Sequence, residues 1–168
     1  MDEREPGWEL VAIVGKIPLY YFTGTIQDGL LLIPQGGEPV FWVRQSHDRA
    51  VAESLFPDIR RMRSYRDVAA AMGNLPRTVY LETDLVPISQ LRRMQKHLPF
   101  TDVRPVDGEV SAVRAVKSPY ELALMEHAGT IHRRVLEDLV PGMLTEGIDE
   151  ITFFCDLYSL MMKEGHQG

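Results

Sequence analysis

The sequence contains very little cysteine. Cys155 is the only cysteine among 168 residues, so no disulfide can form within the chain. A globular chain of this length buries roughly 70% of the surface that its unfolded form exposes, which is enough for a core without covalent staples. A single thiol is also typical of proteins in a reducing compartment. We therefore expect a cytoplasmic protein whose fold rests on hydrophobic burial.

Long apolar runs and an excess of positive charge are also missing. No apolar stretch approaches the roughly 18 to 20 residues that cross a bilayer, and residues 1–6 are acidic, unlike a secretory signal. The net charge of −6 and the pI near 5.4 disfavour nucleic acid or an anionic membrane as the main partner. We interpret the arginines at positions 60, 61, 63 and 66, which have acidic neighbours, as a solvated surface. These features predict no nucleic-acid partner, no membrane and no export.

Self-sufficient catalytic motifs are absent as well. The sequence has no G-x-S-x-G elbow, no G-x-x-x-x-G-K-[ST] loop, no C-x-x-C pair and no H-E-x-x-H. His127 and His132 are five positions apart, so on one helix they point about 140° away from each other and cannot share a metal. We expect His127 to face solvent and His132 to pack at the edge of an apolar stripe. Cys155 has no helix N-terminus beside it, and we expect a small core residue rather than a nucleophile.

Short strands and helices alternate up to about residue 105. The apolar run at 10–14 is typical of a central strand, and residues 30–33 and 40–43 flank a glycine-containing turn that predicts a hairpin. Further strands are expected at 59–64, 78–81 and 102–105, and helices at 46–56, 66–72 and 88–98. The helix that Ser46 caps should pack on the sheet with one apolar side, formed by Val51, Ala52, Leu55 and Phe56. This alternation predicts an α/β fold, a mixed sheet with helices on both faces.

Long helices replace these short elements after Asp107. Ser118-Pro119-Tyr120-Glu121 combines a capping box with a proline at the first helical position, a strong start signal. The apolar stripe that follows continues to Leu139. A second amphipathic helix is expected from about Thr145 to Gly165. Its apolar side consists of Ile148, Ile151, Phe154, Cys155, Tyr158, Met161 and Met162.

No strand follows that could cover these two stripes. Two amphipathic helices with nothing left to pack on indicate the first piece of a second domain. We therefore predict a first domain at residues 1–106 and the opening helices of a second at 107–168. The faces with Leu136, Phe154 and Met161 should make the chain self-associate or swap helices.

The most unusual local string is Tyr20-Tyr21-Phe22-Thr23-Gly24-Thr25. One interpretation is a buried strand end followed by a turn. The other is an aromatic edge that lines a ligand pocket or a subunit interface, formed by Tyr21, Phe22, Thr23 and Gly24, because rigid rings and a close backbone are useful there.

These residues resemble the creatinase, prolidase and Xaa-Pro aminopeptidase family. Tyr21-Phe22-Thr23-Gly24 is similar to the Y-x-T-G string of the family's N-terminal domain. Arg114 to Glu121 is similar to the R-x-x-K-S-x-x-E string that opens its pita-bread catalytic domain. The resemblance implies an N-terminal α/β domain of ribonuclease-H-like layout, which contributes to homodimers or higher oligomers and borders the active site.

The resemblance also implies a chemistry. Members of this family cleave proline-containing peptides with a water held between two divalent metals, such as Mn, Co or Zn, which lower the pKa of the water. The metal ligands are two Asp, one His and two Glu of the catalytic domain. These ligands follow the helices at which this sequence ends, so we assign no catalytic, cofactor or metal residue here and do not promote His166 to a ligand.

The first hypothesis is therefore the N-terminal part of a metal-dependent Xaa-Pro aminopeptidase or dipeptidase, inactive by itself. The second is a non-catalytic interaction module that keeps the peptidase fold. A third is a creatinase-like amidinohydrolase, whose N-terminal strings would look alike.

Overall fold

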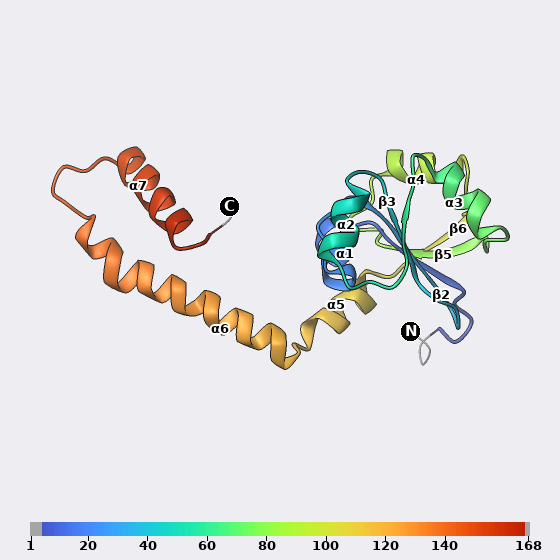
Figure 1. Ribbon diagram of the computed structural model, residues 1–168, viewed down its shortest axis with the longest axis horizontal. Helices are drawn as coiled ribbons and strands as arrows, with labels where there is room; N and C mark the ends of the chain where they lie inside the picture. The colour runs from blue at the N-terminus through green and yellow to red at the C-terminus, as the bar shows by residue number, and fades with distance from the viewer. Residues whose placement is uncertain (1–4, 167–168) are drawn as a thin grey trace. The chain divides into compact units, whose positions relative to one another are not determined.

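The computed structural model describes residues 5–166 (Figure 1). The chain consists of two compact units, Met1–Ala115 and Val116–Gly168, which we call the sheet unit and the helical unit. Helix α5 (Asp107–Ala115) belongs to the sheet unit. The division between the units therefore lies one helix further along the chain than the predicted boundary between residues 106 and 107. Within residues 5–166, no helix is both long enough and apolar enough to span a membrane.

The sheet unit contains one six-stranded sheet in the order β4-β3-β2-β1-β5-β6. The strands are β1 (Leu10–Ile13), β2 (Gly29–Pro34), β3 (Val40–Val43), β4 (Ile59–Arg61), β5 (Thr78–Leu81) and β6 (Asp102–Pro105). Strands β1, β2 and β3 pair antiparallel, whereas β4, β5 and β6 pair parallel with β3, β1 and β5. The predicted mixed sheet and its hairpin are confirmed.

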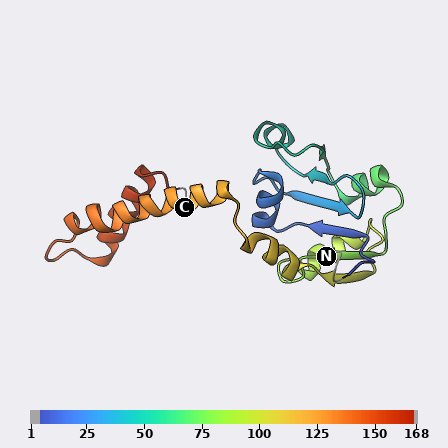
Figure 2. The same cartoon turned by 90° about the horizontal axis from the view of Figure 1, so that it is seen from below.

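Helices cover both faces of this sheet (Figures 1 and 2). Because side chains alternate along a strand, Leu10 and Ala12 of β1 face one core cluster, while Val11 and Ile13 face the other. The first cluster is completed by α3 (Tyr65–Met72) and α4 (Ile88–Gln95). The second is completed by α1 (Lys16–Thr23), α2 (His47–Glu53) and α5. The predicted helices on both faces are therefore confirmed.

Helix α2 differs from its prediction. It ends at Glu53 rather than Phe56, and Ser46 precedes it with φ of +52° and no side-chain capping bond. Ala50 is fully buried, whereas Val51 and Leu55 are 51% and 102% exposed. Because the helix has only about two turns, it presents one small residue to the sheet. Of the predicted apolar side, Phe56 lies beyond the helix and packs against the second core cluster.

The helical unit begins as predicted and then departs from a plain α-helix. Its elements are α6 (Pro119–Arg133), the π-helix η1 (Arg134–Leu139), the 3-10 helix η2 (Val140–Gly142) and α7 (Glu150–Lys163). The capping box is confirmed, because the Glu121 N–H donates to Ser118 Oγ and the Ser118 N–H donates to Glu121 Oε2. Helix α7 starts later than expected, after Asp149, which accepts the N–H groups of Ile151 and Thr152.

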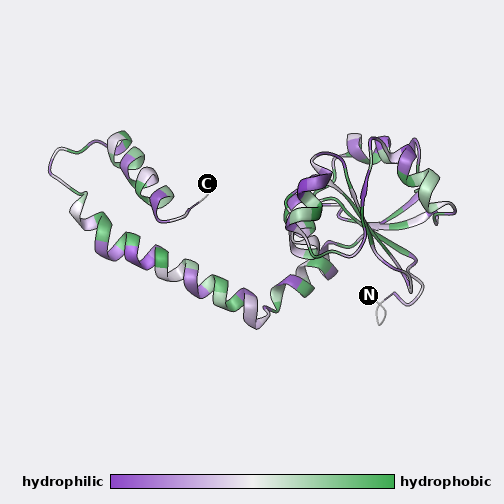
Figure 3. Cartoon of the chain, viewed as in Figure 1, coloured by the Kyte–Doolittle hydropathy of each residue, from purple (hydrophilic) through white to green (hydrophobic). Residues whose placement is uncertain are grey.

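The helical unit has almost no core of its own. Among its described residues only Val135 is buried. Helix α7 turns Phe153, Leu157 and Leu160 inward, and these side chains are half-buried. The side predicted to be its apolar face is largely in solvent, with Ile151 and Phe154 at 76% and 64% exposure. Figure 3 shows hydrophobic residues along both α6 and α7.

The prediction of a buried Cys155 is wrong, because this residue lies on the exposed side of α7. The spacing of apolar residues along the helix placed Cys155 beside Phe154 and Tyr158. Apolar residues surround most of this helix, so the sequence does not determine which side is buried. In the structure the half-buried side contains Phe153, Leu157 and Leu160.

Candidate functional site

The aromatic string lies on a helix rather than on a strand. Tyr20 to Thr23 form the last turn of α1, and Gly24 ends the helix with φ of +74°. The Gly24 N–H donates to the Tyr20 carbonyl at 2.8 Å, which is a left-handed cap that glycine adopts without steric cost. The interpretation as a strand end is wrong, and the interpretation as a turn after the aromatic residues is confirmed.

The three aromatic rings of this turn differ in their exposure to solvent. Tyr20 is 57% exposed. The half-buried rings of Tyr21 and Phe22 meet edge to face, with centroids 5.2 Å apart. Phe22 packs against the core cluster of its sheet face and lines a cavity of about 230 Å³ with Trp8 and Val110. Phe22 is therefore held by packing against the core, whereas Tyr20 lies largely in solvent.

Hydrogen bonds connect the turn at residues 23–25 to the end of helix α2. Thr23 and Thr25 are 3% and 1% exposed. The Thr23 hydroxyl donates to the Leu19 carbonyl at 2.7 Å, and the Ser54 hydroxyl donates to the Thr23 carbonyl. The Thr25 hydroxyl donates to Glu53 Oε2 at 2.8 Å. Residues distant in sequence therefore hold this turn in one position.

Glu53 is ionised in this arrangement. Its pKa lies below the ordinary value, first because the Arg49 guanidinium donates to it and second because the Thr25 hydroxyl does. The Arg49 Nε–Glu53 pair spans one turn of α2. A charged carboxylate is a stronger acceptor for the Thr25 hydroxyl than a neutral one, so the ion pair supports the turn.

Exposed apolar side chains lie on α1, on α2 and in the segments that directly follow each helix. We call this surface the α1–α2 edge. It consists of Ile17, Tyr20, Ile26, Val51 and Leu55, which are 50% to 102% exposed. Single apolar residues on a surface need no explanation, whereas several on two segments that are hydrogen-bonded to each other are compatible with an interface. The edge is suited to contact with another surface rather than to bond cleavage.

The histidines do not assemble into a metal site. Within residues 5–166, no group of three or more His, Cys, Asp or Glu side chains could hold a metal ion. His127 is exposed, as predicted, and His132 borders an apolar groove with Ile131, Met161 and His166. The described residues therefore do not provide a ligand set for the divalent metals that the resemblance implies.

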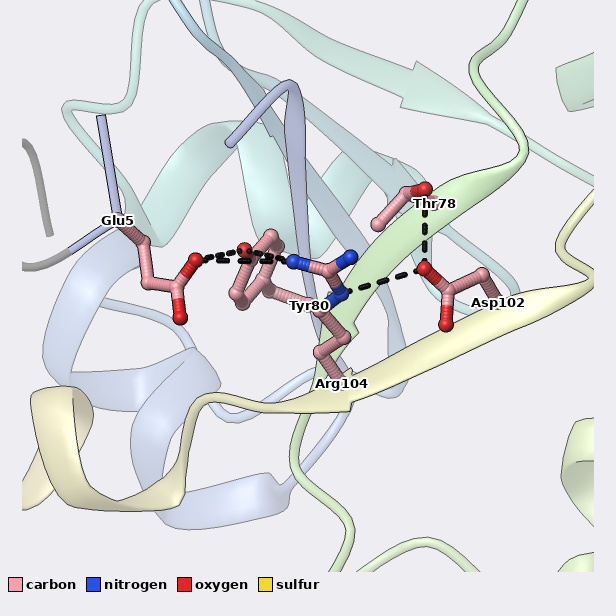
Figure 4. A network of polar contacts seen from close by, with 5 residues as sticks. All are labelled: Glu5, Thr78, Tyr80, Asp102 and Arg104. Carbon is pink, nitrogen blue, oxygen red and sulfur yellow. Dashed lines mark hydrogen bonds and ion pairs between the residues drawn. The ribbon is translucent and has the colours of Figure 1, made fainter. Parts of the chain in front are cut away.

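A second polar cluster lies at the β5–β6 edge of the sheet (Figure 4). The Tyr80 hydroxyl donates to Glu5 Oε2 at 3.0 Å and accepts from Arg104 Nη1 at 3.2 Å. Asp102 accepts from Thr78 and from Arg104, both at 3.2 Å. The pKa of Arg104 is raised, first by Tyr80 and then by Asp102. Each group has a partner, so the cluster joins the N-terminal segment to two strands and is structural.

Sequence reasoning missed one buried carboxylate. Glu82 follows β5 directly and is only 1% exposed. Its Oε2 atom accepts the N–H groups of Val14 and Gly15, at the start of α1. A lone glutamate after a strand carries no local signal, because its partners are distant in the sequence.

The strand order and the helices on both faces define a mixed α/β domain. The sequence profile of the Creatinase/Prolidase N-terminal domain family matches residues 4–116. The chain therefore belongs to this family. No curated protein matches the sequence significantly.

Solved structures share the fold at low sequence identity. The prolidase from Pyrococcus horikoshii OT3 has a TM-score of 0.85 at 20% identity, over 97% of this chain and 46% of that chain. The X-Pro aminopeptidase from Thermotoga maritima MSB8 has a TM-score of 0.78 at 22% identity, over 98% and 48%. The N-terminal domain of an X-Pro dipeptidase from Streptococcus pyogenes gives 0.55 at 19%, over 64% and 89%.

The chain thus spans about half the length of the prolidase and the aminopeptidase. It is an N-terminal domain of the creatinase/prolidase type, followed by helices that fall within the part of the chain matched to these longer relatives.

Proposed function

We propose that this chain is the oligomerisation and active-site-bordering part of a metal-dependent Xaa-Pro aminopeptidase or dipeptidase, and that it does not hydrolyse peptides by itself. The observation that carries the proposal is the coverage. The match includes 97% of this chain but only 46% of the prolidase from Pyrococcus horikoshii OT3. Under this proposal residues 107–168 open the catalytic domain, and the metal, Mn, Co or Zn, is bound by residues that follow them.

The α1–α2 edge supports a role in assembly. Leu55 is completely exposed, and the turn at Tyr21, Phe22, Thr23 and Gly24 is held in place by bonds from α2. A rigid apolar surface loses little conformational entropy on association, which favours an interface at this position. Under the proposal the protein is a cytoplasmic homodimer or higher homo-oligomer, and this turn borders the peptide site of a neighbouring subunit.

A hydrolysis assay tests the catalytic part of the proposal. The chain should release no proline from Gly-Pro or Ala-Pro in the presence of manganese. Hydrolysis that survives removal of contaminating peptidases, and that follows the protein through a second chromatographic step, would contradict it.

The gene beyond the codon for Gly168 provides the complementary test. An open frame that encodes two Asp, one His and two Glu in family order would support the peptidase. A frame in which these ligands are replaced would instead favour a non-catalytic interaction module built on the same fold.

A further inference from the structure

Helix α1 begins without a side-chain cap. Its N-cap residue is Gly15, and its first turn contains no acidic residue. The first N–H groups of a helix have no partner inside the helix, and side chains of Ser, Thr, Asp or Asn commonly accept from them. Gly15 has no side chain to do so.

Glu82, the residue after β5, instead binds the two backbone N–H groups that directly precede the first helical residue, Lys16. Its Oε2 atom accepts from the Val14 N–H at 2.7 Å and from the Gly15 N–H at 2.8 Å. Strand β5, which Glu82 follows, lies parallel to β1, which leads into α1. Hydrogen bonds to a carboxylate are roughly twice as strong as neutral ones, and the helix dipole favours a negative charge at this end.

The close approach of Glu82 requires glycine at position 15. A Cβ atom there would lie 2.8 Å from Glu82 Oε1 and 2.8 Å from Leu85 Cδ1. The φ angle of Gly15 is −63°, which any residue adopts, so space rather than conformation explains the glycine. Glu82 Oε1 has no hydrogen-bond partner in the described part of the chain, so the bonds of this carboxylate there run to the β1–α1 junction.

We propose that Glu82 is a positioning residue for the α1–α2 edge. Helix α1 is held at its start by Glu82 and at its end by Ser54, which donates to the Thr23 carbonyl. The helix has eight residues, or about 12 Å of length, so a shift of its first turn is carried to the aromatic turn at its end. The proposal rests on the proposed function, because it assigns Glu82 to the surface through which subunits associate.

Amide hydrogen exchange of the whole chain tests this role. In Glu82→Ala the amides of Val14, Gly15 and residues 20–24 should exchange about tenfold faster or more, as expected for loss of bonds to a charged acceptor. Glu82→Gln keeps an acceptor oxygen and should restore exchange to within about threefold of the wild type. The matched control is Asp67→Ala, because Asp67 accepts two backbone N–H groups at the start of α3, which packs on the opposite face of the sheet.

Two comparisons decide the outcome. Unchanged exchange at residues 20–24 in Glu82→Ala, or equal acceleration in Asp67→Ala, overturns the positioning role. If Glu82→Ala does not fold, Gly15→Ala tests the positioning role instead. Its added methyl group would displace the Glu82 carboxylate without removing it. Unchanged exchange at residues 20–24 in Gly15→Ala would then overturn the role.

The association constant of the same variants separates this inference from the proposed function. Weaker association in Glu82→Ala, with restoration in Glu82→Gln, supports both. Faster exchange at residues 20–24 with unchanged association upholds the positioning of α1 but overturns the assignment of the edge as an interface.

Discussion

At the scale of single residues, glycine is required at positions 24 and 29 for two different reasons. Gly24 has a positive φ of +74° and open space where a Cβ would lie. At Gly29 of β2, a Cβ would lie 2.2 Å from the backbone oxygen of Trp42 and 2.8 Å from the ring of Phe41. Gly24 is required because its backbone is in the left-handed region, and Gly29 is required because no side chain fits at its position.

Alanine at each position should therefore have a different cost. We expect Gly24→Ala to lower the free energy of unfolding by about 1 kcal/mol, the strain of a left-handed residue. Gly29→Ala should cost about 3 kcal/mol or more, because a strand backbone cannot move away from the added methyl group. Urea unfolding measures both values. Equal costs at the two positions would show that the strand relaxes around the methyl group.

At the scale of elements, the start of α6 depends on one ionised carboxylate. The pKa of Glu121 is lowered below its ordinary value, first by the backbone N–H of Ser118 and then by the Ser118 hydroxyl. A carboxylate with a lowered pKa in the folded state stabilises the helix at pH values above its unfolded pKa. That contribution is lost as the pH falls through the lower folded pKa.

This cap predicts an acid-sensitive helix start. The amide resonance of Ser118 should titrate with a midpoint below the ordinary Glu value of 4.5, and exchange in the first turn of α6 should accelerate below that midpoint. In Glu121→Gln the titration of the Ser118 resonance should disappear, because the amide has no charge to lose. A midpoint at or above 4.5 in the wild type would contradict the capping role.

At the scale of the whole molecule, the two units differ in how much they bury. The sheet unit has two core clusters on the two faces of one sheet. The described part of the helical unit buries only Val135 and exposes Leu136, Ile151 and Phe154 at 59%, 76% and 64%. A unit of this kind exposes more apolar surface than a soluble monomer normally does, so we expect it to contact another surface.

The chain should therefore self-associate through two surfaces, the helical unit and the α1–α2 edge. Sedimentation over a hundredfold range of concentration should show a mass above 19.1 kDa that rises with concentration. Phe154→Lys and Leu55→Lys should each weaken association about tenfold or more, because each places a charge in an apolar contact. Ile88→Lys is the matched control, since Ile88 is 68% exposed on α4, which packs on the opposite sheet face.

The result for each variant has a separate meaning. A monomer at all concentrations would contradict self-association altogether. Equal effects of Leu55→Lys and Ile88→Lys on association would show that the α1–α2 edge is not an interface. The effect of Phe154→Lys tests the helical unit separately.

The sequence by itself determined the elements whose signal is local. The unbroken apolar run of β1, the hairpin of β2 and β3, the strands β5 and β6 and the capping box of α6 all follow from neighbouring residues. The mixed sheet with helices on both faces follows from their alternation. The string around Tyr21 lies within residues 4–116, where the sequence profile confirms the family resemblance.

Only the tertiary structure decided the features that depend on distant partners. Tyr20 to Gly24 end a helix whose N-cap residue, Gly15, donates its N–H to Glu82, and Glu82 is 67 positions away from Gly15. Which side of α7 is half-buried also depends on the tertiary structure, because apolar residues surround that helix on most sides. Local sequence patterns record the preferences of adjacent residues, whereas a bond or contact between distant segments exists only once the chain has folded.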